Sequence, residues 1–415
     1  MTHYKQAVFP MFADQRFEDQ LTNGASIKWS YDSDVSVQDM GSDGSYVSAD
    51  KTITDETLTV DQRPTSQFRI PLTERIQDHR PTQEKWAQKA ANRIFWSIDA
   101  EILGAMKSAA TSTLDAGDFG GTDGNGITVT SSNAAAIFAA ARRLLRNQNV
   151  IYDENKSFKN VMKLDAGSKM AVAAIPAELE EQLGLAIGFK NTEYGDTTLK
   201  SGFLGRIFGF NSVYSGALPF TFRITFTATP TDASTLTIGS VVITWETGTI
   251  DTAGEVKAET DAATSATNLF NFLNAPYASI SAKSQAFVRS SVTVAQQNIL
   301  DRISATNPSA GVVDITVLGG GALTVSQTDA AGAITREAVH ALFGTSQSIG
   351  LIMQRTPEME ISAGNIIGTA TGGYVARDFV AWSLLGWKVF NNQAKQLVDV
   401  AIACSTFANP SNVFN

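Results

Sequence analysis

The sequence has 415 residues, of which 43% are hydrophobic and 18% charged, a composition typical of a globular protein. This length predicts two or three folded units rather than one core. The net charge of −9 provides no general attraction for nucleic acid, and the single cysteine, Cys404, excludes an intramolecular disulfide and fits a reducing compartment. Without a signal-peptide pattern or a long apolar run, we expect a soluble cytosolic product.

The first 80 residues predict an arm followed by an extended loop. Residues 1–30 have no clear periodicity and are expected to form an N-terminal arm. In residues 31–80, two runs with alternating apolar side chains, 52–62 and 65–76, are predicted to pair as a long hairpin through a turn at Arg63 and Pro64. Such a hairpin has little core of its own, so we expect it to lie on another surface.

A long helix is predicted to begin at Thr82, a candidate N-cap, and to end near Ser108. Its apolar stripe starts with Trp86 and Ala90 and continues with a four-residue spacing. About 25 helical residues span roughly 37 Å, a length suited to a structural spine.

Residues 133–148 predict a second helix. Its last turns contain Arg142, Arg143 and Arg146, where the helix dipole favours cations. A solvated helix end is the favoured interpretation of these arginines, and a basic patch is the alternative.

Residues 151–219 predict several short elements: a strand at 161–165, a helix at 167–175 and another helix at about 177–185. The last part, GFLGRIFGFNSVYSGALP at 202–219, combines glycine with aromatic residues. It matches neither a phosphate-binding loop nor a dinucleotide-binding fingerprint, so a ligand cradle is excluded.

The character of the sequence changes after Pro219. Residues 220–334 are rich in Thr, Ala and Ser with alternating runs such as TLTIGSVVITW, which predicts an inserted β-rich domain. Residues 335–415 return to the composition seen before Pro219. In this part, an apolar helix is predicted at 336–352 and a strand at 395–404. A domain interrupted by an insert is the simplest account.

Residues that carry chemistry are scarce. His79 and His340 are predicted to be structural, the latter within a helix, and no nucleophile motif or metal-ligand spacing is present. We therefore predict no catalytic, cofactor-binding or metal-binding residues and no enzyme. A pocket that holds His340 beside a perturbed carboxylate would favour an enzyme instead.

Four segments, in this order, resemble the major capsid protein of tailed bacteriophages with the Hong Kong 97 type coat fold. They are the polar hairpin before TQEKWAQKAANRIFWSIDAEIL, NVIYDENKSFKNVMKLDAGSKMAVA, LKSGFLGRIFGFNSVYSGALP, and REAVHALFGTSQSIGLIMQRTPEMEI followed by RDFVAWSLLGWKVFNNQAKQLVDVAI. Together they cover roughly 300 residues, and their order is more specific than any one of them.

The resemblance implies an α+β coat fold with an N-terminal arm at 1–30, an extended β-hairpin loop at 31–80 and a peripheral domain with the spine helix at 81–150. It further implies an axial domain at 151–219, the inserted domain at 220–334 and a closing axial and peripheral part at 335–415. In this fold, the glycines of 202–219 would allow tight turns while Phe203, Ile207, Phe208, Phe210 and Tyr214 fill the axial core.

The function implied is a shell protein that self-assembles into the icosahedral head around the double-stranded DNA of a tailed phage. Its expected partners are further copies in hexameric and pentameric capsomers, a separate scaffolding protein, a portal, a decoration protein, and DNA contacted non-specifically. It would be assembled in the host cytoplasm and located in the virion, with no membrane contact. An encapsulin-like compartment, and a phage tail or decoration protein, are the alternatives.

The extended loop is expected to reach over an adjacent subunit. Its candidate inter-subunit residues are Arg63, Arg69, Glu74 and Arg75, whose charges would orient the contact. Lysine cross-linking, for which the loop offers mainly Lys51, is not expected.

Overall fold

The protein is described from a computed structural model, which covers residues 7–14, 21, 24–32, 53–71, 82–148, 170–190, 206–275, 292–319, 323–361, 365–369 and 372–403. The chain divides into two compact units. The first unit contains Met1–Phe12, Trp96–Ser348 and Asn392–Asn415, and the second contains Ala13–Phe95 and Ile349–Asn391. Each unit is therefore built from segments that are distant in the sequence.

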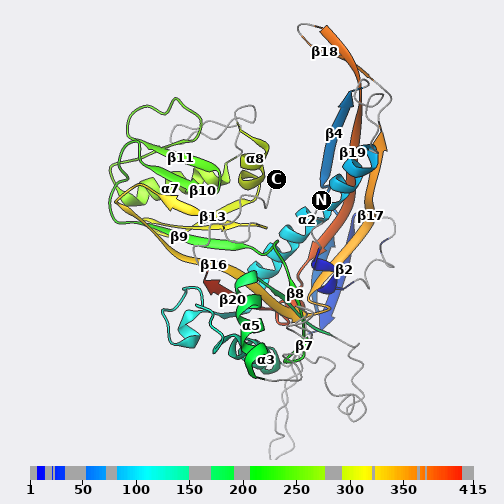
Figure 1. The fold of residues 1–415 in the computed structure, drawn as a ribbon, viewed down its shortest axis with the longest axis vertical. Coiled ribbons are helices and arrows are strands. Elements are labelled where there is room, and N and C mark those ends of the chain that lie inside the picture. Colours follow the sequence, from blue (N-terminus) through cyan, green and yellow to red (C-terminus); the bar gives the residue numbers. More distant parts are fainter. Residues whose placement is uncertain are drawn as a thin grey trace, which may run out of the picture. The chain divides into compact units, whose positions relative to one another are not determined.

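The second unit is built on long antiparallel strands (Figure 1). In its five-stranded sheet, β19 pairs with β17 and then β18 along one edge and with β4 along the other, and the short β1 runs parallel to β17. A separate two-stranded sheet consists of β2 and β3. The strands are β1 Ala13–Asp14, β2 Ser26–Asp32, β3 Ile53–Thr59, β4 Thr65–Pro71, β17 Ile349–Ile361, β18 Asn365–Thr369 and β19 Gly372–Lys388.

The predicted pairing of the extended loop is wrong. The runs on either side of Arg63 and Pro64 are strands, but they do not form a hairpin with each other. Instead, β3 pairs with β2, and β4 pairs with β19, more than 300 residues further along the chain. Strand β4 has a more extensive edge to pair with on the 17-residue β19 than on the seven-residue β3.

A small core holds the second unit together where the two sheets meet. Leu58 and Val60 at the end of β3 pack with Leu21, Ile352 and Phe390. A Cβ at Gly386 of β19 would overlap the carbonyl oxygen of Thr59 and approach Val60 Cα to 2.8 Å. Glycine at this position is therefore required for the close approach of the two strands.

The spine helix α2, Thr82–Ala109, forms over the predicted residues, with residues 82–95 in the second unit and 96–109 in the first. The predicted helices at 133–148 and 177–185 also form. These two helices are α3 Ala134–Asn147 and α5 Ala177–Lys190. The other helical elements are η1 Phe9–Met11, η3 Ala116–Phe119, α7 Ala262–Asn274, α8 Val294–Leu300 and α9 Asn391–Ala394.

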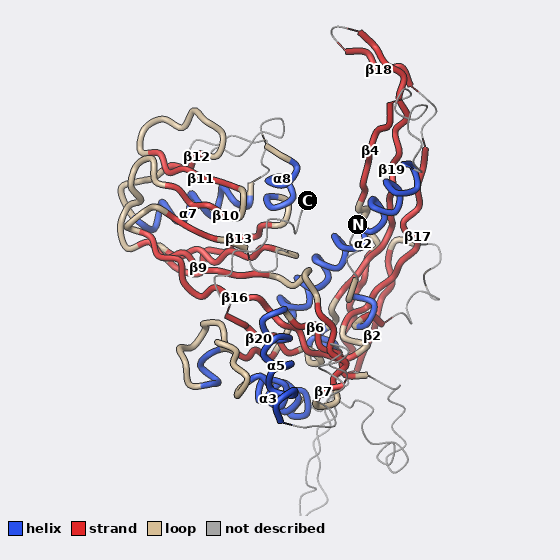
Figure 2. The backbone as a smooth tube through the Cα atoms, viewed as in Figure 1, coloured by secondary structure: helices blue, strands red, loops and turns tan. Residues whose placement is uncertain are grey.

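A nine-stranded sheet organises the first unit, with the order β13-β14-β9-β16-β6-β8-β7; β20 pairs with β16, and β5 pairs with β20. Figure 2 shows its strands in red. A second, four-stranded sheet has the order β12-β11-β10-β15. The strands are β5 Ser112–Leu114, β6 Ala171–Ile175, β7 Arg206–Ile207, β8 Phe210–Tyr214, β9 Phe220–Phe226, β10 Thr235–Ile238, β11 Val241–Glu246, β12 Glu255–Lys257, β13 Ile303–Ser309, β14 Val312–Val317, β15 Val325–Gln327, β16 Gly332–Thr345 and β20 Val398–Ala403.

Two predicted helices are strands in this structure. The segment predicted as a helix at 167–175 contains β6, and the apolar segment at 336–352 contains most of β16 and the start of β17. Strand β6 and the later part of β16 are buried on both faces. Their sequences are therefore continuously apolar and lack the alternation by which a strand is recognised. The predicted strand at 395–404 is confirmed as β20, whereas the one predicted at 161–165 lies outside the described residues.

The core of the first unit lies between this sheet and helices α3 and α5. Phe138 of α3 and Phe343 of β16 meet edge to face with ring centroids 5.0 Å apart, and Phe210 of β8 lies 5.2 Å from Phe343. Phe210 and Ile207 thus fill the core as expected. Phe208 and Tyr214 do not, because their side chains are 43% and 52% exposed, and Phe203 lies outside the described residues.

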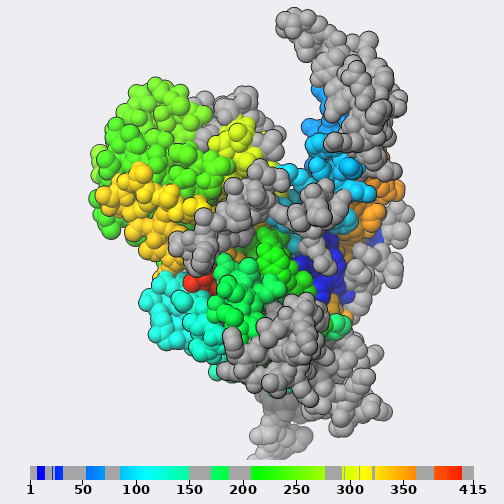
Figure 3. Space-filling view, viewed as in Figure 1, coloured from blue at the N-terminus to red at the C-terminus, as the bar shows by residue number. Residues whose placement is uncertain are grey.

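Residues 220–334 are joined to the axial strands by the sheet itself. Strand β9 pairs with β16, whose later residues pair with β6 and β20. Helix α7 packs on β13 and β14 and also contacts β12 of the four-stranded sheet. Figure 3 shows this segment in green and yellow. Its status as a separate inserted domain, like the other domain boundaries, stays a prediction.

Candidate assembly interface

The extended-loop residues proposed for subunit contact lie partly within the described chain. Arg63 is exposed in the connection between β3 and β4, and Arg69 is exposed on β4. Glu74, Arg75 and Lys51 lie outside the described residues. The two described arginines therefore belong to the segment that joins the two sheets of the second unit.

Arg69 already has an acidic partner in its own chain. It lies opposite Asp378 in the β4–β19 pairing, and its Nε and Nη2 donate to the two carboxylate oxygens at 2.6 and 3.2 Å. The hydrogen bond from Arg69 holds the pKa of Asp378 below its usual value. Because the pair is exposed, its main effect is to fix the register of the strands rather than to add stability.

An aromatic patch, consisting of Phe68, Phe379, Trp86 and Lys89, lies on the opposite face of the β4–β19 pair from this ion pair, because successive residues of a strand point to opposite faces. Phe68 stacks on Phe379 with ring centroids 4.9 Å apart, and the Trp86 ring lies 6.0 Å from Phe68. The Lys89 ammonium lies 4.6 Å from the centre of the Trp86 ring. Phe379 is buried, so strand β4 and the first turns of α2 provide the exposed part of the patch.

Trp86 is the residue of this patch that sequence reasoning misplaced. The regular spacing along α2 assigned it to the same apolar stripe as Ala90, yet Trp86 is 45% exposed while Ala90 is buried. Exposed tryptophan beside a cation is typical of the contact residues of protein interfaces. We therefore regard the aromatic patch as the centre of a candidate assembly interface.

The β2–β3 ribbon extends the polar surface of the second unit. Ser30 donates to Asp55 across the two strands at 2.5 Å, and Ile53 at the start of β3 is exposed. The Lys388 ammonium lies 3.6 Å from Glu56 and donates to the Thr57 carbonyl oxygen, which ties the ribbon to β19. Leu58 and the Trp29 ring, which lies 5.3 Å from Phe390, also hold the ribbon on its own chain.

His340 lies in a strand, β16, and not in the predicted helix. Its Nδ1 lies 2.8 Å from Asp399 of β20, and its Nε2 lies 2.6 Å from the Thr221 hydroxyl of β9. His340 and Asp399 are buried, and neither lines the pocket found in the first unit. The network joins three strands of one sheet, which is a structural role.

The described part of the chain contains no cluster of three or more His, Cys, Asp or Glu residues that could hold a metal ion. Among its helices, none is both long and apolar enough to cross a membrane.

Comparison with known proteins gives matches among solved structures alone. No family model matches the chain, and no curated protein sequence matches it. A structure from Mycobacterium phage Che8 covers 96% of this chain and 93% of its own, with 12% identity and a TM-score of 0.52. The capsid structure of cyanophage P-SCSP1u has 12% identity and a TM-score of 0.49, covering 98% of this chain and 90% of its own.

The likeness to the Che8 structure spans nearly the whole of both chains and shows a shared fold. The predicted α+β class is confirmed by the helices and strands of both units.

Proposed function

We propose that this chain is a major capsid protein, which self-assembles into the icosahedral head shell that encloses the double-stranded DNA genome of a tailed phage. The observation that carries the proposal is the coat fold shared over 96% of the chain. The role is structural rather than enzymatic.

The candidate assembly interface supports this function. A shell needs contacts between many copies that close by symmetry. Each contact contributes modest affinity, because a subunit held at several edges gains avidity from all of them. Trp86, Arg63 and Ile53 of the β2–β3 ribbon are exposed residues of the second unit and are candidates for such contacts.

The partners follow from this role. Copies of the chain would form hexameric and pentameric capsomers, with a scaffolding protein, a portal and a decoration protein as further partners. DNA would be contacted through its backbone, without sequence readout. Assembly would take place in the host cytoplasm, and the finished protein would be part of the virion.

Electron microscopy of the expressed chain, with and without a candidate scaffolding protein, tests the proposal. Closed shells or capsomer rings are expected, and a monodisperse monomer under both conditions would contradict a coat function. Shells that retain a cargo enzyme instead of DNA would assign the chain to a storage compartment.

A further inference from the structure

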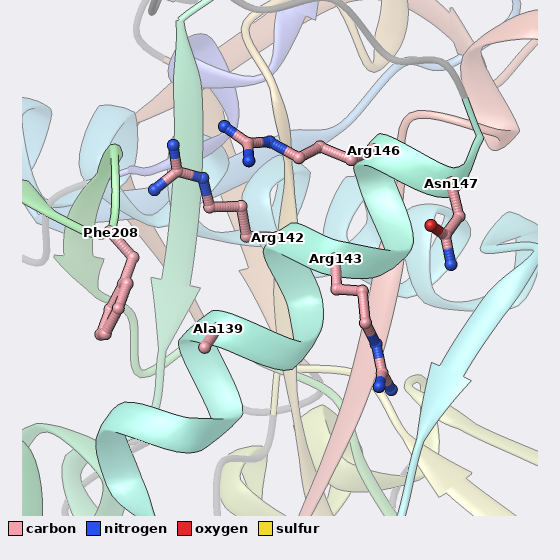
Figure 4. Close-up of a pocket in the computed structure, with 6 residues that line it drawn as sticks. All are labelled: Ala139, Arg142, Arg143, Arg146, Asn147 and Phe208. Atoms are coloured by element: carbon pink, nitrogen blue, oxygen red, sulfur yellow. The ribbon is translucent and has the colours of Figure 1, made fainter.

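The first unit contains a basic pocket that the assembly contacts do not use. It has a volume of about 320 Å³ and is lined by Ala139, Arg142, Arg143, Arg146, Asn147 and Phe208 (Figure 4). Five of these residues come from α3, and Phe208 comes from the turn between β7 and β8. None of the lining residues is acidic, so the pocket, which we name the arginine pocket, has a positive charge.

Helix α3 presents the arginines on its outer side. Its inner side carries Ile137, Phe138 and Leu145, which are fully buried in the core. This packing fixes the orientation of the helix, so that Arg143 and Arg146 are exposed to solvent. In Figure 4, Arg142 and Arg146 point to the same side, whereas Arg143 points away from them. An anion on that side therefore meets the guanidinium groups of Arg142 and Arg146.

The helix dipole does not explain the whole pocket. Its influence falls off within the last turn, whereas Arg142 lies five residues before the end of α3 at Asn147. Phe208 adds an aromatic wall from a separate element. With Gly209, at φ of 47° and 87°, it forms the two-residue turn of the β7–β8 hairpin, and this turn holds the exposed Phe208 ring beside the arginines.

We propose that the arginine pocket binds phosphate groups of the nucleic-acid backbone. This inference rests on the proposed function, which brings DNA next to many copies of the chain. Guanidinium groups match the oxygens of a phosphate with paired hydrogen bonds, and the amide of Asn147 is a further donor. The contact is independent of sequence, because only the backbone is engaged.

Because the chain is acidic overall, any DNA binding by it can be attributed to a local basic cluster such as the arginine pocket. With a formal charge of −9, the protein as a whole repels DNA, so binding must come from local clusters. Each phosphate contact steepens the dependence of log K on log salt concentration by about 0.9. The pocket therefore predicts weak, strongly salt-dependent binding per subunit, which is multiplied when copies are arranged side by side.

The test measures the fluorescence anisotropy of a short labelled DNA duplex with the full chain over a range of salt concentrations. Arg142→Gln/Arg146→Gln is expected to lower the affinity roughly tenfold and to reduce the salt slope by about 1.8, because two phosphate contacts are lost. The matched control, Arg355→Gln/Lys395→Gln, removes the same charge at two exposed sites outside the pocket and should retain binding.

Equal losses in the two double variants would overturn the proposal, since they would show a general charge effect. Unchanged binding in the pocket variant would also overturn the proposal. Displacement of the labelled DNA by poly-glutamate at a lower concentration than by unlabelled DNA would overturn it too, because it would assign the pocket to an acidic protein segment. Circular dichroism establishes that both variants fold. Electron microscopy of the same samples separates this outcome from the proposed function: shells without DNA binding reject the pocket alone.

Discussion

At the scale of single residues, the most unusual group is the carboxylate of Asp99 in α2. It is fully buried, and its Oδ1 accepts the backbone N–H groups of Val8 and Phe9 at 2.9 and 2.6 Å. Its Oδ2 has no partner within the described part of the chain. Burial raises the pKa of Asp99 to about 6, although the two backbone hydrogen bonds lower it. The residue thus anchors the N-terminal segment at an electrostatic cost.

This cost predicts a pH dependence. Because the folded-state pKa of Asp99 lies above its unfolded value of 3.8, the folded state binds the proton more tightly. The contribution of Asp99 to stability is therefore fully present below pH 4 and is lost as the pH rises to about 6. The loss is about 3 kcal/mol for a shift of about two units.

Urea unfolding of the protein and of Asp99→Asn between pH 4 and pH 7 measures this effect. The free energy of unfolding of the parent protein should fall relative to that of the variant as the pH rises, and the comparison cancels the titration of other carboxylates. A difference between the two proteins that stays constant over this range would contradict the assignment.

The His340 network gives a second prediction at this scale. Replacing His340 with Leu leaves the Asp399 carboxylate buried without its histidine partner, so we expect a loss of about 3 to 5 kcal/mol. The double variant His340→Leu/Asp399→Leu should recover much of this loss, because no charge stays buried. Thermal unfolding of the two single variants and the double variant measures the coupling, and additive effects would show that the pair does not interact.

At the scale of elements, the sequence predicts what is amphipathic and local. Helices α2, α3 and α5 follow from their spacing, as does strand β20. Prediction from periodicity fails for β6 and the later part of β16, where every side chain is buried and no periodicity remains. The pairing of β4 with β19 and the ion pair of Arg69 with Asp378 join residues 309 apart, which no local pattern reveals.

Gly386 tests the close approach of β19 to the end of β3. In Gly386→Ala, the new methyl group would overlap the backbone of Thr59, so we expect a loss of several kcal/mol in the free energy of unfolding. Gly184→Ala in α5 is the matched control, because a Cβ there meets no atom within 4 Å. The control should gain about 0.5 to 1 kcal/mol from helix propensity. Similar thermal unfolding of the two variants would reject this account.

At the scale of the whole molecule, the proposed function requires surfaces whose partners are other copies of the chain. The resemblance that predicted an α+β fold rests on the order of four segments, each of which is weak. The inter-subunit role of Arg63 and Arg69 stays a prediction, and the exposure of Trp86 was not predictable because it depends on which strands lie beside α2.

The aromatic patch predicts an assembly defect without a folding defect. Trp86→Ser/Arg63→Ser should lower the yield of particles at least tenfold, because it removes an exposed aromatic anchor and a charge from the contact. The midpoint of thermal unfolding of the unassembled chain should stay unchanged. Val242→Ser, at a position on β11 that is 46% exposed, is the control and should assemble normally. Normal particle yield from the double variant would remove the patch from the interface.

The most direct test of the central claim is a cryo-electron microscopy reconstruction of the particles formed by the expressed chain with its scaffolding protein. We predict closed icosahedral shells built from hexamers and pentamers, with the aromatic patch of each copy buried against a neighbouring copy. Particles without icosahedral order, or a chain that stays monomeric at every concentration, would contradict the claim that this is a coat protein.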